Sequence, residues 1–346
     1  MYKTFIRPVL FLFDAEKVHN FVLSFFSKNT FFYPLLKLLY SPDKNESIKL
    51  DSIVFKNRLG LAAGFDKYGI GLKFFEILGF SHMEIGTVTP YPQPGNPKPR
   101  IFRLTKDKAL INRLGFNNGG ANDVMLNIQK ARKLVSKDFI IGINIGKNRA
   151  TSVENAVDDY KICINQLYNY ASYFTLNISS PNTEGLRKLQ EEKYLDKLLS
   201  EIQSENHRLS PAGVNTDIKN LKPVFVKIAP DLNYDMIEII FNLCIRHRIT
   251  GIIATNTTVL RPKLKSDITE EGGLSGKPLK KLSDEVLSKL NKLNSRSPEK
   301  KLVLIASGGV FDKKDFLDKI ECGASLVQIY TGFVYEGPGI IKKILN

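Results

Sequence analysis

Eight short runs rich in Val, Ile and Leu recur along the chain, and each is followed by polar or glycine residues and then by an amphipathic stretch. The runs span residues 58–65, 83–90, 139–146, 173–180, 223–230, 250–257, 302–309 and 326–333. Strands that are apolar on both faces belong to parallel sheets covered by helices. Eight of them in strict alternation predict an α/β fold, a closed (β/α)8 TIM barrel. An open doubly wound sheet is the alternative, but no G-x-G-x-x-G motif follows the first run, as a dinucleotide fold would require.

The first 40 residues differ in composition from the rest, since they hold 11 of the 35 Phe and Tyr residues. Asp14 can cap a helix whose apolar face carries Val18, Phe21, Val22 and Phe25, and a second short helix is expected after residue 30. No apolar stretch approaches the roughly 20 residues needed to span a bilayer. Charged residues also follow residues 9–13 too early for a signal-peptide core.

We interpret residues 1–45 as an amphipathic helical segment and residues 46–346 as the barrel domain. The aromatic excess, flanked by Lys3, Arg7, Lys28 and Lys37, suits an interfacial helix pair in peripheral contact with membrane lipid. The alternative is that these helices only pack against the barrel. A chain of 346 residues fits one barrel with such an appendage.

The formal net charge of +15 fits either an anionic partner or lysine-rich solvated helices without one. The lysines are scattered and no basic run alternates with aromatic residues, so we expect no nucleic-acid partner. Cys163, Cys244 and Cys322 form no CxxC motif, and their odd number indicates a reducing compartment. The four histidines show no metal-ligand spacing, so we expect no metal.

Nearly every apolar run ends in a chemically useful residue, and in a barrel these carboxyl ends converge on one mouth, where active sites form. The residues are Asp66, Lys67, Thr87, Asn144, Ser179, Ser180, Lys227, Thr255, Asn256, Gly308, Gly309, Tyr330 and Thr331. Polar residues also terminate strands for structural reasons, and Asp66 is available as an ion-pair partner of Lys67. The coincidence of eight such ends nevertheless favours a binding site.

Two connections are too long for plain turns, namely residues 91–118 and the stretch that begins at Pro181. Long ordered loops in compact domains are usually functional, and Gly185 gives the second connection the character of a mobile lid. A disordered insertion is the alternative. The proline-rich segment PQPGNPKPR within the first connection can also be interpreted as a rigid surface loop.

The segment NISSPNTEGLR, residues 177–187, can present Ser180 on a loop above a ligand. Its asparagines Asn177 and Asn182 offer both donors and acceptors, which match the alternating N–H and C=O edge of an imide ligand. Lys67 and Lys227 bring positive charge to the same mouth. Glycines and hydroxyls after the last two strands occupy the positions where barrels bind phosphate through backbone N–H groups.

Nine segments, in this order and spacing, resemble the dihydroorotate dehydrogenase family over essentially the whole chain. They are AAGFDK (62–67), EIGTVTP (84–90), PQPGNPKPR (92–100), NRLGFNN (112–118), NISSPNTEGLR (177–187), KIAPDL (227–232), TNTT (255–258), GGLSGKPL (272–279) and YTGF (330–333). The resemblance implies FMN as cofactor and oxidation of (S)-dihydroorotate to orotate in pyrimidine biosynthesis.

The resemblance also implies roles for residues at matching positions. Ser180 would be the catalytic base. FMN would be held by Ala63, Gly64, Phe65, Asp66, Lys67, Thr87, Asn144, Asn177, Lys227, Thr255, Gly276, Gly309, Tyr330 and Thr331. The substrate would be held by Lys67, Asn112, Arg113, Leu114, Gly115, Phe116, Asn177, Asn182, Asn256 and Thr257.

Two features resemble the quinone-linked class 2 enzymes, because cytosolic members carry cysteine in place of Ser180 and lack the N-terminal segment. The helices would then form the entrance for a membrane quinone, with Arg7 and His19 in the segment that lines it. Without a targeting or spanning segment, we expect a peripheral position on the cytoplasmic face of a bacterial inner (cell) membrane.

Tyr68, Glu184, Ala306 and Ser307 depart from the family pattern at the lid and the phosphate site without removing a catalytic group. Two other functions remain as alternatives. Another FMN barrel oxidoreductase, such as a dihydrouridine synthase, would need a lid cysteine and an RNA-binding domain. A non-catalytic basic nucleic-acid-binding protein would lack the flavin and bind in a salt-sensitive way.

Overall fold

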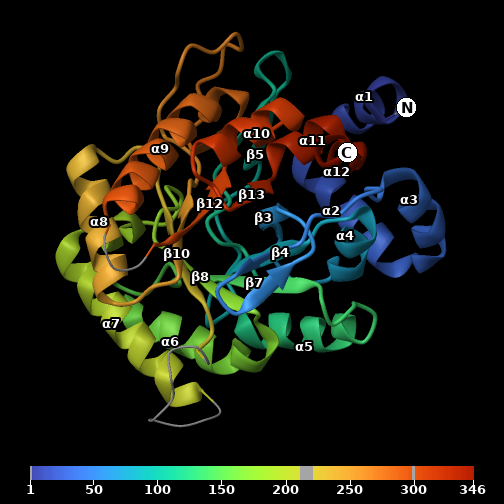
Figure 1. Cartoon of the computed structure of the whole chain (residues 1–346). Helices are drawn as coiled ribbons and strands as arrows, with labels where there is room; N and C mark the ends of the chain where they lie inside the picture. The colour runs from blue at the N-terminus through green and yellow to red at the C-terminus, as the bar shows by residue number, and fades with distance from the viewer. Residues whose placement is uncertain (1, 211–220, 298–300) are drawn as a thin grey trace.

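Eight parallel strands close into a barrel in the computed structural model of the chain, which describes residues 2–210, 221–297 and 301–346 (Figure 1). The strands are β3 (Leu59–Asp66), β4 (His82–Val88), β7 (Ile140–Ile145), β8 (Tyr173–Asn177), β9 (Val224–Ile228), β10 (Gly251–Ala254), β12 (Val303–Ser307) and β13 (Leu326–Ile329). Each begins within or beside one of the eight predicted runs. The closed (β/α)8 barrel is therefore confirmed, and the open-sheet alternative is excluded.

In the described part of the chain, nine helices follow the strands and cover the barrel (Figure 1). They are α4 (Leu72–Leu78), α5 (Gly120–Arg132), α6 (Ala156–Leu167), α7 (Glu192–Leu209), α8 (Tyr234–Arg246), α9 (Lys280–Arg296), α10 (Lys313–Glu321), α11 (Thr331–Glu336) and α12 (Gly339–Leu345), and short turns η3 (Thr105–Asp107), η4 (Tyr168–Tyr170), η5 (Leu186–Gln190) and η8 (Lys277–Leu279) connect several elements. Helix α8 shows how such a helix forms. Asn233 caps its first turn, and Ile237, Ile240, Phe241 and Cys244 are buried against the sheet.

A hairpin of β1 (Ile48–Leu50) and β2 (Ile53–Phe55) covers the amino end of the barrel. Phe55 packs in a cluster with Ile140 and Tyr173, which are the first residues of β7 and β8. The hairpin thus closes the end opposite the site, so that the ligand-binding mouth lies only at the carboxyl ends of the strands.

A second small sheet lies at the mouth and was not predicted. The connection of residues 91–118 contains β5 (Ile101–Leu104) and β6 (Ala109–Asn112), which pair antiparallel, and β6 pairs in turn with β11 (Gly273–Gly276). The disordered-insertion alternative is therefore wrong for this connection, whereas residues 92–100, interpreted as a surface loop, lie outside both strands. The sheet brings residues that are about 160 positions apart in sequence to one wall of the site.

The N-terminal segment folds into η1 (Tyr2–Ile6), α1 (Arg7–Phe11), α2 (Ala15–Lys28), η2 (Thr30–Phe32) and α3 (Tyr33–Tyr40). Asp14 accepts the N–H of Lys17 at 2.9 Å and caps α2, as predicted. The helix over η1 and α1 was not predicted. These helices lie beside α4 and α12 at one side of the barrel (Figure 1). Within the described ranges, no helix combines the length and apolar character that crossing a bilayer requires.

Candidate active site

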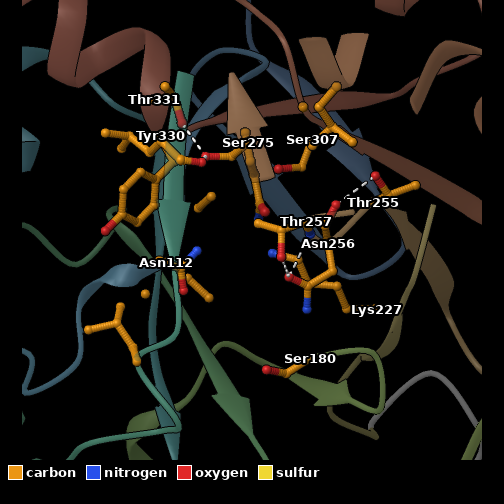
Figure 2. A pocket seen from close by; sticks show the side chains of 18 of the residues that line it. Asn112, Ser180, Lys227, Thr255, Asn256, Thr257, Ser275, Ser307, Tyr330 and Thr331 are labelled. Carbon is orange, nitrogen blue, oxygen red and sulfur yellow. Dashed lines mark hydrogen bonds between the residues drawn. The ribbon is translucent and has the colours of Figure 1, made fainter. Parts of the chain in front are cut away.

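A cavity opens at the carboxyl ends of the barrel strands, and the predicted site residues converge there (Figure 2). Those that line it are Ala63, Gly64, Lys67, Thr87, Asn112, Leu114, Gly115, Phe116, Asn177, Ser180, Asn182, Lys227, Thr255, Asn256, Thr257, Gly276, Gly309, Tyr330 and Thr331. Figure 2 shows Ser180 on one side and Ser275, Ser307 and Thr331 on the other, with Lys227 and Asn256 between them. Amide, hydroxyl and ammonium groups thus share this cavity with apolar wall residues.

Beneath this cavity, a carboxylate holds together side chains from four strands. Glu84 on β4 is fully buried and accepts hydrogen bonds from Thr175 at 3.0 Å, from Gln328 Nε2 at 2.9 Å and from Asn144 Nδ2 at 3.2 Å. Because buried polar groups need partners, this network fixes the rotamers at the floor of the site. Sequence reasoning missed both Glu84 and Gln328.

The asparagines above the floor are fixed by one another. Asn177 Nδ2 donates to Thr87 Oγ1 at 2.8 Å, and Thr87 Oγ1 donates to Asn144 Oδ1 at 2.6 Å. Asn256 Nδ2 donates to Asn177 Oδ1 at 3.2 Å and to Ser179 Oγ at 3.0 Å. The amides are therefore pre-organised toward the cavity, which suits recognition of a planar ligand with alternating donors and acceptors.

Ser180 lies at the tip of the loop that follows β8. Its Oγ accepts the backbone N–H of Asn182 at 3.3 Å, and the residue is 6% exposed. Thr183 Oγ1 is buried and has no hydrogen-bond partner among the described residues. Arg187 anchors the same loop, because it donates to the Ser179 carbonyl at 3.1 Å and pairs with Asp231 at 2.9 Å. The serine is thus held by a braced loop.

Two lysines bring positive charge to the cavity. Lys67 donates to Asn117 Oδ1, and burial lowers its pKa to about 7. No hydrogen bond joins the Lys227 ammonium to the described residues; burial lowers its pKa as well, and the charge of Glu84 offsets part of this effect. A buried cation without an anionic partner is costly unless a ligand compensates it. Both ammonium groups therefore indicate an anionic or strongly polar ligand.

Asp66 does not form the ion pair with Lys67 that the sequence made available. Its carboxylate is buried and accepts the backbone N–H groups of Gly69 at 2.8 Å, of Gly71 at 2.7 Å and of Tyr68 at 3.1 Å. It therefore shapes the turn after β3. Lys67 donates to Asn117 instead and lines the cavity.

Glycines at the far wall leave room for a phosphate-bearing group. Gly276, Gly308 and Gly309 have φ values of 96°, 124° and 79°, and a Cβ at Gly309 would approach Lys280 Cβ to 2.4 Å. Only glycine adopts such backbone without strain. Hydroxyls of Ser275 and Thr331 meet at 2.8 Å beside them. Positive-φ glycines with adjacent hydroxyls are the donor set that phosphate groups need, so the residues fit a flavin mononucleotide.

A second, apolar cavity of about 620 Å³ lies under the N-terminal helices. Val18, His19 and Val22 of α2 line it, together with Phe65 from β3. It shares Ile101, Leu110 and Tyr330 with the polar cavity. Two chemically different cavities therefore lie on either side of one thin wall.

Polar groups at the apolar cavity are tied to protein atoms. His19 lies edge-on to Phe65 at 4.8 Å, and burial lowers the pKa of His19 to about 4. Arg103 donates to the carbonyls of Phe11 at 3.1 Å and of Phe13 at 2.9 Å. Arg7 does not line this cavity and donates to the Tyr335 carbonyl at 3.0 Å. The interior of this cavity is thus largely hydrocarbon and aromatic.

Four predicted site residues do not line the polar cavity. Phe65 lies in the apolar one, and Asp66 and Asn144 act from beneath through the hydrogen bonds above. Arg113 turns outward, where it pairs with Glu270 and lies 4.6 Å from the centre of the Phe102 ring. Conversely, the cavity includes polar side chains that were not predicted to line it, namely Ser275, Ser307 and Gln328. The sequence signal for Gln328 was a glutamine within the apolar run of residues 326–333.

The family model described as dihydroorotate dehydrogenase matches residues 47–346. A "Dihydroorotate dehydrogenase (quinone)" of Christiangramia forsetii is 44% identical over 349 residues, with 99% of this chain and 97% of the relative covered. One of Idiomarina loihiensis is 43% identical, with 99% and 98% covered. A crystal structure of an Eimeria tenella DHODH in complex with ferulenol is 36% identical, with a TM-score of 0.86 and 96% and 89% covered. As the motifs predict, this chain belongs to the dihydroorotate dehydrogenase family.

Proposed function

We propose that this chain oxidises (S)-dihydroorotate to orotate with FMN and passes the electrons to a membrane quinone, in de novo pyrimidine (UMP) biosynthesis. The observation that carries the proposal is the pair of cavities that share Ile101, Leu110 and Tyr330. One is lined by amides, hydroxyls and lysines and suits a polar heterocyclic acid. The other is apolar and suits a lipid-soluble quinone.

FMN supplies the redox chemistry, because it is a carrier that takes up a hydride and releases electrons to a quinone. Its phosphate and sugar would be held by Thr255, Gly276, Gly309, Tyr330 and Thr331, which lie next to Ser275 and Ser307. The ring would be held by Ala63, Gly64, Lys67, Thr87, Asn177 and Lys227. These residues would be supported from behind by Phe65, Asp66 and Asn144. The ammonium of the buried Lys227 would stabilise negative charge on the reduced ring.

The substrate would lie between the lid and the amides. Asn112, Asn177, Asn182, Asn256 and Thr257 would bond its imide edge, and the ammonium of Lys67 would pair with its carboxylate. The loop of residues 112–116 contributes Leu114, Gly115 and Phe116 to the cavity wall. Arg113 holds this loop through Glu270, so its side chain supports the site from outside.

Ser180 would remove the proton from C5 of dihydroorotate. A serine hydroxyl is a weak base, so it must pass its own proton onward as it accepts another. Thr183 lies in the same loop, and its buried hydroxyl, which has no partner among the described residues, would relay that proton toward water. Asn182 N–H and the Arg187 anchor hold Ser180 in position for this step.

The N-terminal segment, residues 1–45, would contact membrane lipid, and the barrel domain, residues 46–346, would carry both half-reactions. Exposed apolar side chains cluster on the helices, with Leu12 at 82% and Phe31 at 86% exposure. Such a patch marks a membrane or protein contact. The proposal places the chain on the cytoplasmic face of a bacterial inner membrane. It includes neither a metal ion nor a nucleic acid.

The first test follows the absorbance of the purified flavoprotein under anaerobic conditions. Addition of dihydroorotate should bleach the flavin, and a soluble quinone should restore the absorbance, whereas fumarate and NAD should not. Protein without flavin, or flavin that dihydroorotate does not bleach, would contradict the proposal.

Ser180→Ala should slow flavin reduction by dihydroorotate by at least about a hundredfold, the usual contribution of a general base. FMN content and reoxidation by quinone should stay at the wild-type level, because the substitution leaves the glycine-rich wall and the apolar cavity unchanged. Ser152→Ala, in a surface turn before α6, serves as the matched control. A wild-type rate of flavin reduction in Ser180→Ala would exclude Ser180 as the base.

A further inference from the structure

A buried ion pair joins the quinone-side helix to the substrate-side loop. Glu16 on α2 accepts Arg100 Nε at 2.9 Å and Arg100 Nη2 at 2.7 Å, in a bidentate geometry. Glu16 is 7% exposed and Arg100 is 5% exposed. Breaking one side of such a pair leaves a buried charge without compensation. Removing either partner would therefore change the electrostatic potential at the neighbouring side chains.

Arg100 also shapes the loop before β5. Its Nη1 donates to the carbonyls of Pro94 at 2.7 Å and of Asn96 at 2.8 Å. Asn96 Nδ2 in turn donates to the carbonyls of Arg113 at 2.9 Å and of Asn182 at 3.4 Å. Through these contacts the ion pair reaches both loops that would hold the substrate.

The guanidinium lies close to the partner of Lys67. A Cβ at Gly95 would lie 2.9 Å from Arg100 Nη1 and 2.8 Å from Asn117 Cβ, so both side chains border the same small space. Asn117 Oδ1 accepts the Lys67 ammonium. Three charged side chains, Glu16, Arg100 and Lys67, thus follow one another from α2 to the cavity.

We propose that Glu16 is a positioning residue for the dihydroorotate site: by holding Arg100 it offsets the guanidinium charge beside Lys67, which keeps Lys67 cationic for the substrate carboxylate. This inference rests on the proposed function. The helix that lines the apolar cavity then also determines how tightly the polar cavity binds its acid. Lys98, whose ammonium lies 3.7 Å from Glu16 and whose side chain is 66% exposed, is the other cation at the carboxylate.

Burial and the neighbouring charges determine in which direction each substitution should shift the pKa of Lys67. The pKa of Lys67 is lowered to about 7, mainly by burial and also by the Arg100 charge, while the Glu16 charge raises it. Removing Glu16 should therefore favour the neutral amine, and removing Arg100 should favour the ammonium. A purely structural role would instead make both substitutions act in the same direction.

The experiment measures orotate binding by calorimetry and flavin reduction by dihydroorotate, both between pH 6 and pH 9, with the FMN-loaded protein. In Glu16→Gln, the pH above which orotate affinity declines should move down, with about tenfold weaker binding near pH 8, as a displacement of one pH unit implies. In Arg100→Gln, this pH should move up. The half-saturating concentration of dihydroorotate should follow orotate affinity, while the limiting rate of flavin reduction should change little.

Two further variants make the test specific. Glu16→Asp keeps the carboxylate and should retain the wild-type pH dependence. Lys17→Gln neutralises the next residue, which is exposed on the same helix, and should leave orotate binding unchanged. Displacement of the two pH profiles in the same direction, or no displacement, would overturn the role of Glu16. Wild-type protein that binds no orotate would overturn the proposed function and this inference with it.

Discussion

Histidine 82 shows how one residue can tie stability to pH. It lies on β4 at the amino end of the barrel, where Ser81 Oγ meets its Nδ1 at 2.8 Å and the Phe55 ring lies 5.2 Å away. Its Nε2 is buried and has no partner among the described residues. Burial lowers the pKa of His82 from 6.5 to about 3. The folded state thus requires the neutral ring.

The sign follows from linkage, because the unfolded chain binds a proton at His82 near pH 6.5 and the folded chain does not. The contribution is complete above that pH and is lost as the pH falls toward 3. His82→Gln should reduce the slope of the unfolding free energy against pH between 6 and 4 by up to about 1.4 kcal/mol per pH unit. Denaturant unfolding at several pH values measures it. The half-buried His207→Gln is the control, and an unchanged slope in His82→Gln would contradict the assignment.

The segment of helices α1 to α3 both lines the apolar cavity and exposes apolar side chains to solvent. The inner face of α2 lines the apolar cavity through Val18, His19 and Val22, whereas Leu12 in the turn after α1 and Phe31 in η2 are exposed. Amphipathic helices divide in this way when one face packs on protein and part of the rest meets lipid. The element therefore predicts lipid binding that can be changed without changing the cavity.

Combined Leu12→Ser and Phe31→Ser should lower binding to vesicles of mixed neutral and anionic lipid by at least about tenfold. Burial of one such side chain contributes about 1.5–3 kcal/mol, and 1.4 kcal/mol corresponds to a factor of ten. Vesicle sedimentation measures the effect, while flavin reduction by dihydroorotate should be unchanged. Leu317→Ser, which alters a 44% exposed leucine on α10, is the control. Unchanged sedimentation of the double variant would place the lipid contact elsewhere.

At the scale of the whole molecule, the barrel separates the two half-reactions. The polar cavity is built from strand ends and the β5–β6–β11 sheet, whereas the apolar cavity is closed by the N-terminal helices. Because only Ile101, Leu110 and Tyr330 belong to both, a change deep in one cavity should affect one half-reaction. This arrangement favours two substrates that react in turn without meeting.

Val22→Trp should fill part of the apolar cavity and raise the half-saturating concentration of quinone by about tenfold or more, since overpacking costs about 1–3 kcal/mol. Flavin reduction by dihydroorotate should keep its wild-type rate and affinity. Stopped-flow measurement of each half-reaction separates the two effects. Asn20→Trp adds the same ring at an exposed position of α2 and should change neither. A variant in which only the dihydroorotate half-reaction suffers would contradict this division.

Sequence by itself determined the barrel, because each strand and helix carries its pattern within a few residues. The apolar runs, the Asp14 cap and the polar residues at strand ends are local signals of this kind, and the motifs identified the family. Most of the candidate site followed, since parallel strands in a barrel must end at one mouth.

Tertiary structure alone decided which of these residues face the cavity and which support it. Pairing of β6 with β11, the bond from Gln328 to Glu84 and the ion pair of Glu16 with Arg100 join positions 84 to 244 residues apart. Asp66 turned to backbone N–H groups and Arg113 turned to Glu270, although their neighbours in sequence face the cavity. Local patterns encode which face of an element is buried, but the partner of a polar side chain depends on which distant segment closure of the barrel brings beside it.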